Sequence, residues 1–194
     1  MNDTLYLFIG KSASGKTTSA NLLNEKYGLK QVFSYTTRPK RYKNETGHIF
    51  INDTEFDNLN KLIAHTIYNG YRYGATLDQL NECSIYVIDI SGLETLLKNW
   101  LDYKRPIRVI YFDAAVSTRI DRMVDRGDSD IQIISRLHTD DTPDDWYRQL
   151  DKIVWKYKNI DFMNVELYEI NANANIEDVL QQVLYCINND EKLE

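Results

Sequence analysis

The chain has 194 residues, a formal net charge of −6 and a hydrophobic fraction of 43%. This length predicts one domain with room for inserted lobes, and the acidic balance excludes a general positive field that would attract nucleic acid. The two cysteines, Cys83 and Cys186, are far apart, which excludes a disulfide scaffold and indicates a reducing compartment. Without a signal-like start or an apolar stretch of membrane-span length, the sequence predicts a cytoplasmic protein with neither a membrane nor a nucleic-acid partner.

The stretch from Gly10 to Thr18 fits the pattern G-x-x-x-x-G-K-[ST] of phosphate-binding loops. An apolar run at 4–9 precedes it and predicts a buried strand, and helically spaced apolar residues follow it up to Gly28. This order of strand, loop and helix would place bound phosphates at a helix N-terminus. An ordinary turn rich in glycine and serine is the alternative.

The motif assigns a role to each part of the loop. Lys16 would bring a positive charge to the β- and γ-phosphates of a nucleoside triphosphate, and the Thr17 hydroxyl would ligate Mg²⁺, the expected cofactor. Backbone N–H groups between the two glycines would point at phosphate oxygens. The residues expected at the phosphates are Ser12, Ala13, Ser14, Gly15, Lys16, Thr17 and Thr18.

After the first helix, residues 31–33 predict a short strand and the segment from Ser34 to Arg41 predicts a loop. Pro39 forbids a regular strand or helix interior at this point. The hydroxyls of the segment and its arginines, Arg38 and Arg41, suit a monophosphate, because a guanidinium fork binds two phosphate oxygens at once. A solvated basic turn is the alternative.

Several motifs together resemble the guanylate kinase family. They are the phosphate-binding loop, Ser-x-Thr-Thr-Arg-x-x-Arg from Ser34, Glu45-x-Gly47-x-x-Phe50, Tyr73-Gly74-x-Thr76 and Ile88-Asp89-Ile90-x-Gly92. The resemblance implies an α/β fold in which a parallel sheet covered by helices carries the phosphate-binding loop. It also implies a single domain over 1–194, with the core at 1–33 and 84–194, an inserted monophosphate-binding lobe at about 34–83 and a short lid at about 126–142.

The activity that the resemblance implies is transfer of the γ-phosphate of ATP to GMP or dGMP with Mg²⁺. In this family, residues matching Arg38, Arg41 and Tyr73 hold the phosphate of the acceptor, and a serine matching Ser34 contacts its base. Phe50 stands where a tyrosine is usual, so the ring is kept and one hydroxyl contact is lost.

The base site departs from the family pattern at two positions. Ala64 occupies the place of the carboxylate that reads guanine, and Ala75 that of a small hydroxyl residue. A site without its hydrogen-bonding partner loses discrimination, so either another side chain supplies the acceptor or the base is not guanine. His65, Asp78 and Glu82 are the candidate replacements, with an ordinary core-edge histidine as the alternative for His65.

Residues 84–90 predict the next buried strand, and Asp89 lies near its C-terminal end, where ligands bind in open α/β sheets. A carboxylate there can hold Mg²⁺ through water, orient Lys16 or take part in the monophosphate site. The family often has a second acid two residues earlier, where this chain has Val87. An aspartate that merely ends a strand is the alternative.

Strands predicted at 107–112 and 165–170 alternate with helices and complete the α/β pattern. The resemblance implies that Arg126 and Arg136 are lid arginines that stabilise the transferring phosphoryl group, as donors must where charge spreads over its oxygens. Arg122 is a further candidate, whereas Arg119 is expected to face solvent. Asn171, after the last strand, is a candidate for the adenine side.

Three functions remain open from the sequence. The first is a guanylate or deoxyguanylate kinase, and the second is a kinase of the same fold for another (deoxy)nucleoside monophosphate. The third is a non-catalytic binding module, although an intact phosphate-binding loop argues against a scaffold. The base, the sugar and the oligomeric state are not determined by these motifs.

Overall fold

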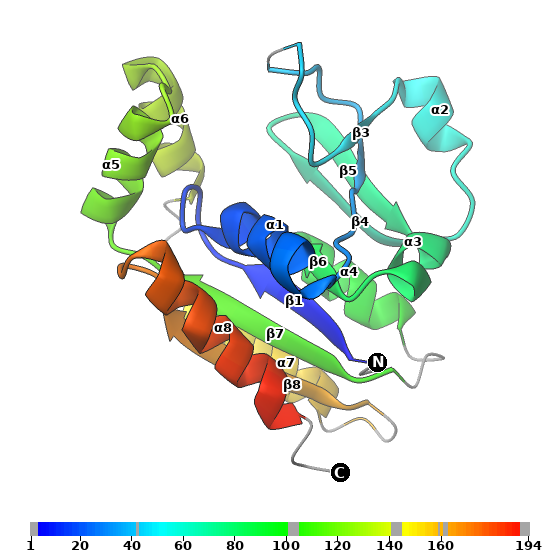
Figure 1. Ribbon diagram of the computed structural model, residues 1–194. Helices are drawn as coiled ribbons and strands as arrows, with labels where there is room; N and C mark the ends of the chain where they lie inside the picture. The colour runs from blue at the N-terminus through cyan, green and yellow to red at the C-terminus, as the bar shows by residue number, and fades with distance from the viewer. Residues whose placement is uncertain are drawn as a thin grey trace.

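The computed structural model describes residues 4–41, 43–100, 105–140, 145–158, 160 and 163–190. A four-stranded parallel sheet lies at its centre, in the order β6-β1-β7-β8 (Figure 1). Its strands are β1 (Leu5–Ile9), β6 (Ile85–Val87), β7 (Ile107–Asp113) and β8 (Val165–Asn171). The α/β class and the parallel sheet predicted from the sequence are therefore confirmed.

Helices cover both faces of this sheet, as all-parallel sheets require. Helices α1 (Lys16–Tyr27) and α8 (Ile176–Asp190) pack on one face, and α4 (Ile90–Asn99) and α7 (Trp146–Lys158) on the other. Because successive strand residues point to opposite faces, Leu7 packs toward α4 and α7, whereas Phe8 packs toward α1 and α8. Both faces of β1 are therefore excluded from solvent.

A second, mixed sheet lies within residues 34–83, in the order β3-β2-β5-β4. Its elements are β2 (Tyr35–Thr36), β3 (Ile49–Phe50), α2 (Asp53–Asp57), β4 (Leu62–Tyr68), β5 (Tyr71–Thr76) and α3 (Leu77–Glu82). The β4–β5 hairpin turns through Asn69 and Gly70, at φ 50° and 77°. Positive φ at both positions defines the type I′ turn, whose twist matches that of the two strands.

The remaining helices, α5 (Val116–Asp125) and α6 (Asp130–Asp140), form an arm beside the central sheet (Figure 1). Gly127, at φ 83°, lets the chain reverse between them. The arm overlaps the predicted lid range of 126–142, of which residues 141 and 142 lie outside the described residues. In the part of the chain that the structure describes, no helix has the length and apolarity to cross a membrane.

The shortest elements differ from the sequence predictions. Of the strand expected at 31–33, only Gln31 forms an isolated bridge, with Ile85. The strand expected at 84–90 ends at Val87, because Asp89 is the N-cap of α4 and accepts a hydrogen bond from the Gly92 N–H at 2.6 Å. Helix α3 was not predicted, since its six residues carry no periodic apolar face of useful length.

Two isoleucines test where the core lies. Ile110, fully buried in β7, should lose about 2–5 kcal/mol of unfolding free energy when changed to alanine. Ile131, which is 80% exposed on α6, should change by less than about 0.5 kcal/mol for the same substitution. Urea unfolding followed by tryptophan fluorescence measures both, and equal losses would contradict the packing described here.

Candidate functional site

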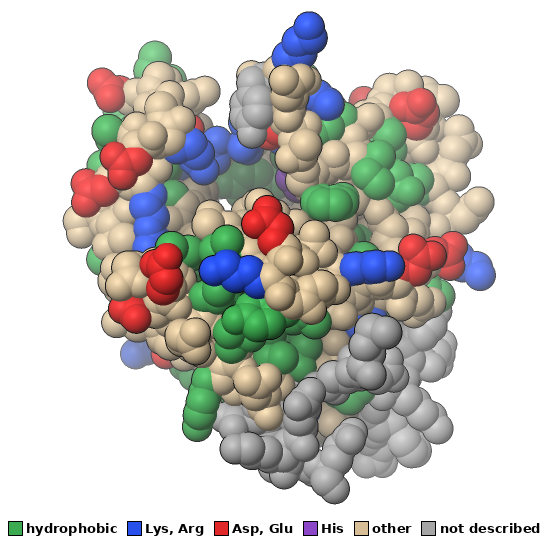
Figure 2. Space-filling model, in the orientation of Figure 1, with side chains coloured by type: hydrophobic (Ala, Val, Ile, Leu, Met, Phe, Trp, Pro, Cys, Tyr) green, Lys and Arg blue, Asp and Glu red, His purple; other side chains and the backbone are tan. Residues whose placement is uncertain are grey.

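Two hollows meet at the loop between β1 and α1. The first has a volume of about 470 Å³ and lies between the loop residues 13–18, α5 and the start of α8. The second, of about 220 Å³, lies between the loop, the second sheet and α6. Lys16 lines both hollows. Figure 2 shows the surface hollowed between the α5–α6 arm and the second-sheet region, with Lys and Arg side chains on its walls.

The glycines of the loop are required by its geometry. A Cβ on Gly10 would lie 2.7 Å from the Phe112 carbonyl oxygen and 2.8 Å from Ser14 Oγ, closer than real atoms approach. Gly15, at φ 101°, has the left-handed backbone that glycine adopts most easily. Gly15 is also the N-cap of α1 and carries no side-chain oxygen, so the first N–H groups of the helix are left for an anion.

Lys16 folds back onto the loop that precedes it. Its Nζ donates to the carbonyl oxygens of Gly10 at 2.6 Å and Lys11 at 2.8 Å, and to Ser14 Oγ at 3.2 Å. Burial of the ammonium group lowers the pKa of Lys16 to about 8, against the attraction of Asp140. An anion bound beside this amine would raise its pKa again and favour the charged form.

Thr17 and Thr18 are exposed in the first turn of α1 and line the first hollow. Among the described residues, no group of three or more His, Cys, Asp or Glu side chains could by itself hold a metal ion. Mg²⁺ in nucleotide sites takes one or two protein oxygens and completes its shell with water and phosphate. The Thr17 hydroxyl, one residue from Lys16, fits that limited demand.

Arg122 connects the loop between β1 and α1 to the segment that follows β8. Its guanidinium donates to the carbonyl oxygens of Ala172 at 2.8 Å, Ala174 at 3.2 Å and Ala13 at 3.4 Å. This candidate lid arginine therefore shapes the wall of the first hollow. Asn171 instead accepts from the Asn173 N–H and lines neither hollow.

The sequence analysis missed the residues that line the first hollow after β8, namely Ala174, Asn175, Ile176 and Val179. Asn175 directly precedes α8, and its Oδ1 accepts from the Asp178 N–H at 3.0 Å. No motif marks these residues, because they reach the hollow through the packing of α8 beside α1.

Glu45 organises the basic loop of the second hollow. Its carboxylate accepts two hydrogen bonds from Arg38, at 2.8 and 3.2 Å, and one from the Arg41 N–H at 2.6 Å. Burial alone would raise the pKa of Glu45, but the bonds from Arg38 and Arg41 outweigh it and hold this pKa below its usual value. The Arg41 side chain stays half exposed and lines the hollow.

Arg38 in turn holds Tyr73. Its Nε donates to the Tyr73 hydroxyl oxygen at 3.2 Å, which leaves the hydroxyl proton of Tyr73 free to point into the second hollow that this residue lines. Phe50 lies outside both hollows and packs under cations, with Arg38 at 5.3 Å and Lys40 at 5.1 Å from its ring centroid. The ring therefore supports the arginine rather than facing the hollow.

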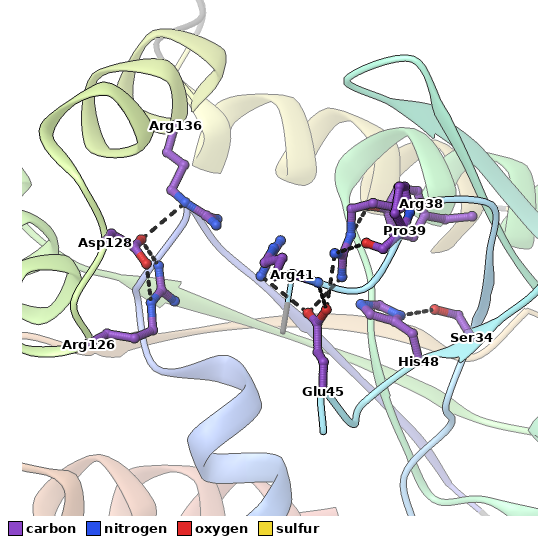
Figure 3. A network of polar contacts seen from close by, with 10 residues as sticks. Ser34, Arg38, Pro39, Arg41, Glu45, His48, Arg126, Asp128 and Arg136 are labelled. Carbon is purple, nitrogen blue, oxygen red and sulfur yellow. Dashed lines mark hydrogen bonds and ion pairs between the residues drawn. The ribbon is translucent and has the colours of Figure 1, made fainter. Parts of the chain in front are cut away.

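His48 is a site residue that the sequence analysis did not single out. Its Nδ1 lies 3.0 Å from Ser34 Oγ (Figure 3). Its ring meets that of Tyr73 edge to face, with the ring centroids 5.5 Å apart. Burial, helped by the charges of Arg38 and Arg41, lowers the pKa of His48 to about 4. The neutral imidazole of His48 therefore contacts Ser34, the serine that was expected to contact a base. The two residues come together only because β2 pairs with β3 in this register.

The two alanines of the predicted base site do not line the second hollow. Ala64 and Ala75 are buried in the core, at 1% and 0% exposure, and pair across the hairpin. The acids that line the hollow are Asp89 and Asp140, whereas Asp78 and Glu82 lie on α3 away from it. Burial raises the pKa of Asp89, although its carboxylate accepts hydrogen bonds from the Gly92 N–H and Thr66. His65 lines the hollow, with its Nε2 buried and unpartnered among the described residues.

Arg126 and Arg136 are brought together by a shared acid. Both make ion pairs with Asp128, in which Arg136 Nε lies 3.2 Å from Asp128 Oδ2. Burial opposes ionisation of Asp128, but the two arginines prevail and keep its pKa below the usual value. Figure 3 shows this cluster facing Arg41 and Glu45. Arg136 and Arg41 line the second hollow, whereas Arg126 lines the first.

Arg119 was expected to face solvent, and that prediction is wrong. Its side chain is 3% exposed, and its Nη1 lies 3.0 Å from Asp140 Oδ2. The same carboxylate oxygen accepts from the Ser12 N–H at 2.7 Å. Spacing on α5 could not reveal this pair, because the buried partner comes from α6.

A scan against protein-family models finds no match to this chain, and a search of curated proteins finds no relative. The comparisons therefore assign neither a family nor a function, and a functional proposal has to rest on the residues of the site.

The Arg38–Glu45 pair gives a test of this basic loop. Because the folded state holds the pKa of Glu45 below 4.5, the carboxylate stabilises the fold above that pH and loses this contribution as pH falls through the lowered value. Glu45→Gln should therefore cost about 3–5 kcal/mol of unfolding free energy at pH 7, since it leaves Arg38 buried without its counter-charge. The deficit should shrink as the pH falls from 4.5 through the lowered pKa in chemical unfolding, and a deficit independent of pH would contradict this account.

Proposed function

We propose that this chain is a kinase of the guanylate kinase family that transfers the γ-phosphate of ATP to a nucleoside monophosphate. The observation that carries the proposal is the position of Lys16, which lines both hollows at the start of α1. ATP in the first hollow and a nucleoside monophosphate in the second would both lie beside the ammonium group of Lys16. The region 34–83 then serves as the acceptor lobe, and the α5–α6 arm as the lid.

The reaction needs no covalent intermediate. An oxygen of the acceptor monophosphate attacks the γ-phosphorus in line, and the new P–O bond forms as the bond to the β-phosphate oxygen breaks and ADP leaves. Arg41 and Tyr73 would hold the acceptor, with Arg38 orienting Tyr73. Lys16 and the N–H groups at the start of α1 would hold the donor phosphates.

The positive charges of the lid would stabilise the transition state. Arg126 and Arg136 now share the single negative charge of Asp128, so a phosphoryl group between the two hollows would supply the negative charge that the two arginines still lack. Bound Mg²⁺, held by Thr17, would neutralise further phosphate charge. Closing the lid would exclude water that could otherwise hydrolyse ATP. A cytoplasmic location for this activity stays a prediction.

The base of the acceptor is open to a second candidate. Ala64 and Ala75 are buried in the core and line neither hollow, so the wall of the second hollow lacks the family's carboxylate and hydroxyl at these positions. Ser34, His48 and Thr66 offer hydroxyl and neutral imidazole groups in their place. GMP and dGMP come first by family resemblance, and another (deoxy)nucleoside monophosphate is the alternative that this wall favours. A non-catalytic binding module would have no use for a shaped triphosphate loop.

A substrate panel tests the function directly. ADP release from Mg·ATP should appear with at least one of GMP, dGMP, AMP, dAMP, CMP, dCMP, UMP and dTMP. Lys16→Met should lower kcat by about 100-fold or more, since it removes a charge that acts in the transition state. Lys26→Met, at the exposed end of the same helix, is the control and should leave kcat unchanged. No turnover with any acceptor would overturn the kinase proposal.

The lowered pKa of Lys16 predicts how ATP affinity depends on pH. The free protein loses the Lys16 proton near pH 8, so above this value binding must include proton uptake. Affinity for Mg·ATP should therefore fall by up to about tenfold per pH unit between pH 8.5 and 10. Calorimetric titration in buffers of different ionisation enthalpy should detect the uptake. Lys16→Met should remove it, and uptake that survives in this variant would assign the proton to another group.

A further inference from the structure

The turn between α5 and α6 places one carboxylate beside two arginines. Arg126 is the C-cap of α5, and Asp128 follows it after Gly127. The Gly127 N–H donates to the Val124 carbonyl oxygen at 2.8 Å, and the Asp128 N–H donates to that of Met123 at 3.0 Å, which is the pattern of a Schellman motif. Main-chain bonds therefore fix the position of Asp128 independently of its side chain.

The start of α6 is fixed by local hydrogen bonds as well. The Ser129 N–H donates to Gln132 Oε1 at 2.8 Å, and the Gln132 N–H donates to Ser129 Oγ at 3.4 Å. This reciprocal pair is a capping box, in which neither bond uses the carboxylate of Asp128. Changing that carboxylate to an amide should therefore leave both helices of the arm in place.

The carboxylate of Asp128 contacts both of the predicted lid arginines (Figure 3). Arg126 donates from Nε to Oδ1 at 3.1 Å and from Nη2 to Oδ2, and Arg136 Nε lies 3.2 Å from the same Oδ2. Among the described residues, no other acid makes an ion pair with either arginine. Two guanidinium groups repel each other, so the two side chains would move apart without this carboxylate.

The two arginines belong to different hollows. Arg126 lines the first hollow together with Lys16, whereas Arg136 lines the second together with Arg41. Asp128 lines neither hollow. Its carboxylate therefore sets the separation between a cation at the expected donor site and a cation at the expected acceptor site.

We propose that Asp128 is a positioning residue that holds Arg126 at the first hollow and Arg136 at the second as one unit before any substrate binds. Donors that are already oriented need no reorganisation when negative charge develops between them. The coupling of the two arginines stands without a substrate, whereas its effect on phosphoryl transfer rests on the proposed function. Asp128 belongs to none of the motifs by which the chain resembles guanylate kinases.

NMR spectroscopy of the ligand-free protein tests the coupling without any reaction. The Nε–H signals of the two arginines are assigned by their loss in Arg126→Lys and Arg136→Lys. Asp128→Asn should shift both signals, because both Nε atoms lie beside its carboxylate. Asp121→Asn, at an exposed aspartate of α5 outside both hollows, removes the same charge and should shift neither. A shift of the Arg126 signal alone would overturn the proposal.

Kinetics separate a positioning role from a merely structural one. With the acceptor found in the panel, Asp128→Asn should lower kcat about tenfold and change the KM of either substrate less than about twofold, because the arginines act on the transition state. Asp128→Glu keeps the charge and should retain most of the lost kcat. A loss as large in Asp128→Glu as in Asp128→Asn would assign the effect to the turn instead of the charge and overturn the proposal.

The two proposals can fail separately. Shifts of both arginine signals in a protein without turnover would retain the coupling by Asp128 and reject the kinase. Turnover with kcat unchanged in Asp128→Asn would retain the kinase and reject the positioning role.

Discussion

The arrangement of this site depends on holding several positive charges close together, each against carboxylate or backbone carbonyl oxygens. Lys16 satisfies its ammonium with loop carbonyls, Arg38 with Glu45, and Arg119 with Asp140. Arg126 and Arg136 share Asp128. Each carboxylate holds its cations in a fixed place, at the cost of being a partner that a phosphate would have to displace or accommodate.

The parallel sheet explains why these groups converge. In the order β6-β1-β7-β8, the chain leaves β1 toward one side of the sheet and later crosses to the other. The C-terminal ends of the parallel strands, including β1 and β6, therefore lie at the same edge of the sheet, which is where ligands bind in sheets of this kind. The phosphate-binding loop follows β1 and Asp89 follows β6, so both arrive at that edge by topology alone.

The polar groups of the second hollow are of two kinds. Arg41 and Arg136 line it with positive charge, whereas Ser34, His48 and Thr66 line it with hydroxyl and imidazole groups. Ala64 and Ala75 are buried in the core and do not line it. Ser34 is held by a neutral His48 instead of facing an acid. Specificity built from hydroxyl and imidazole groups is more permissive than that of a buried carboxylate, because no full charge is left unpaired by the wrong base.

Much of the architecture could be predicted because its causes are local. The glycine spacing of residues 10–15 requires a tight loop. The continuous apolar runs of β1 and β7 predict strands that are buried on both faces, as they are in the structure. The two-residue strand β2 and helix α3 were not predicted, since elements that short are stabilised by neighbours rather than by their own pattern. The adenine-side candidate Asn171 and the hollow-lining Asn175 look alike in sequence, and only the packing of α8 distinguishes them.

The sequence by itself determined the loop, the α/β alternation and the set of arginines available for phosphate. Only the tertiary structure decided which acid neutralises which arginine, because pairing across α5 and α6 or across β2 and β3 depends on distances that spacing does not contain. For the same reason Arg119 is buried against Asp140 rather than solvated, and His48 lies on Ser34. A charge in a sequence has no partner until folding brings one within a few ångströms and removes the water between them.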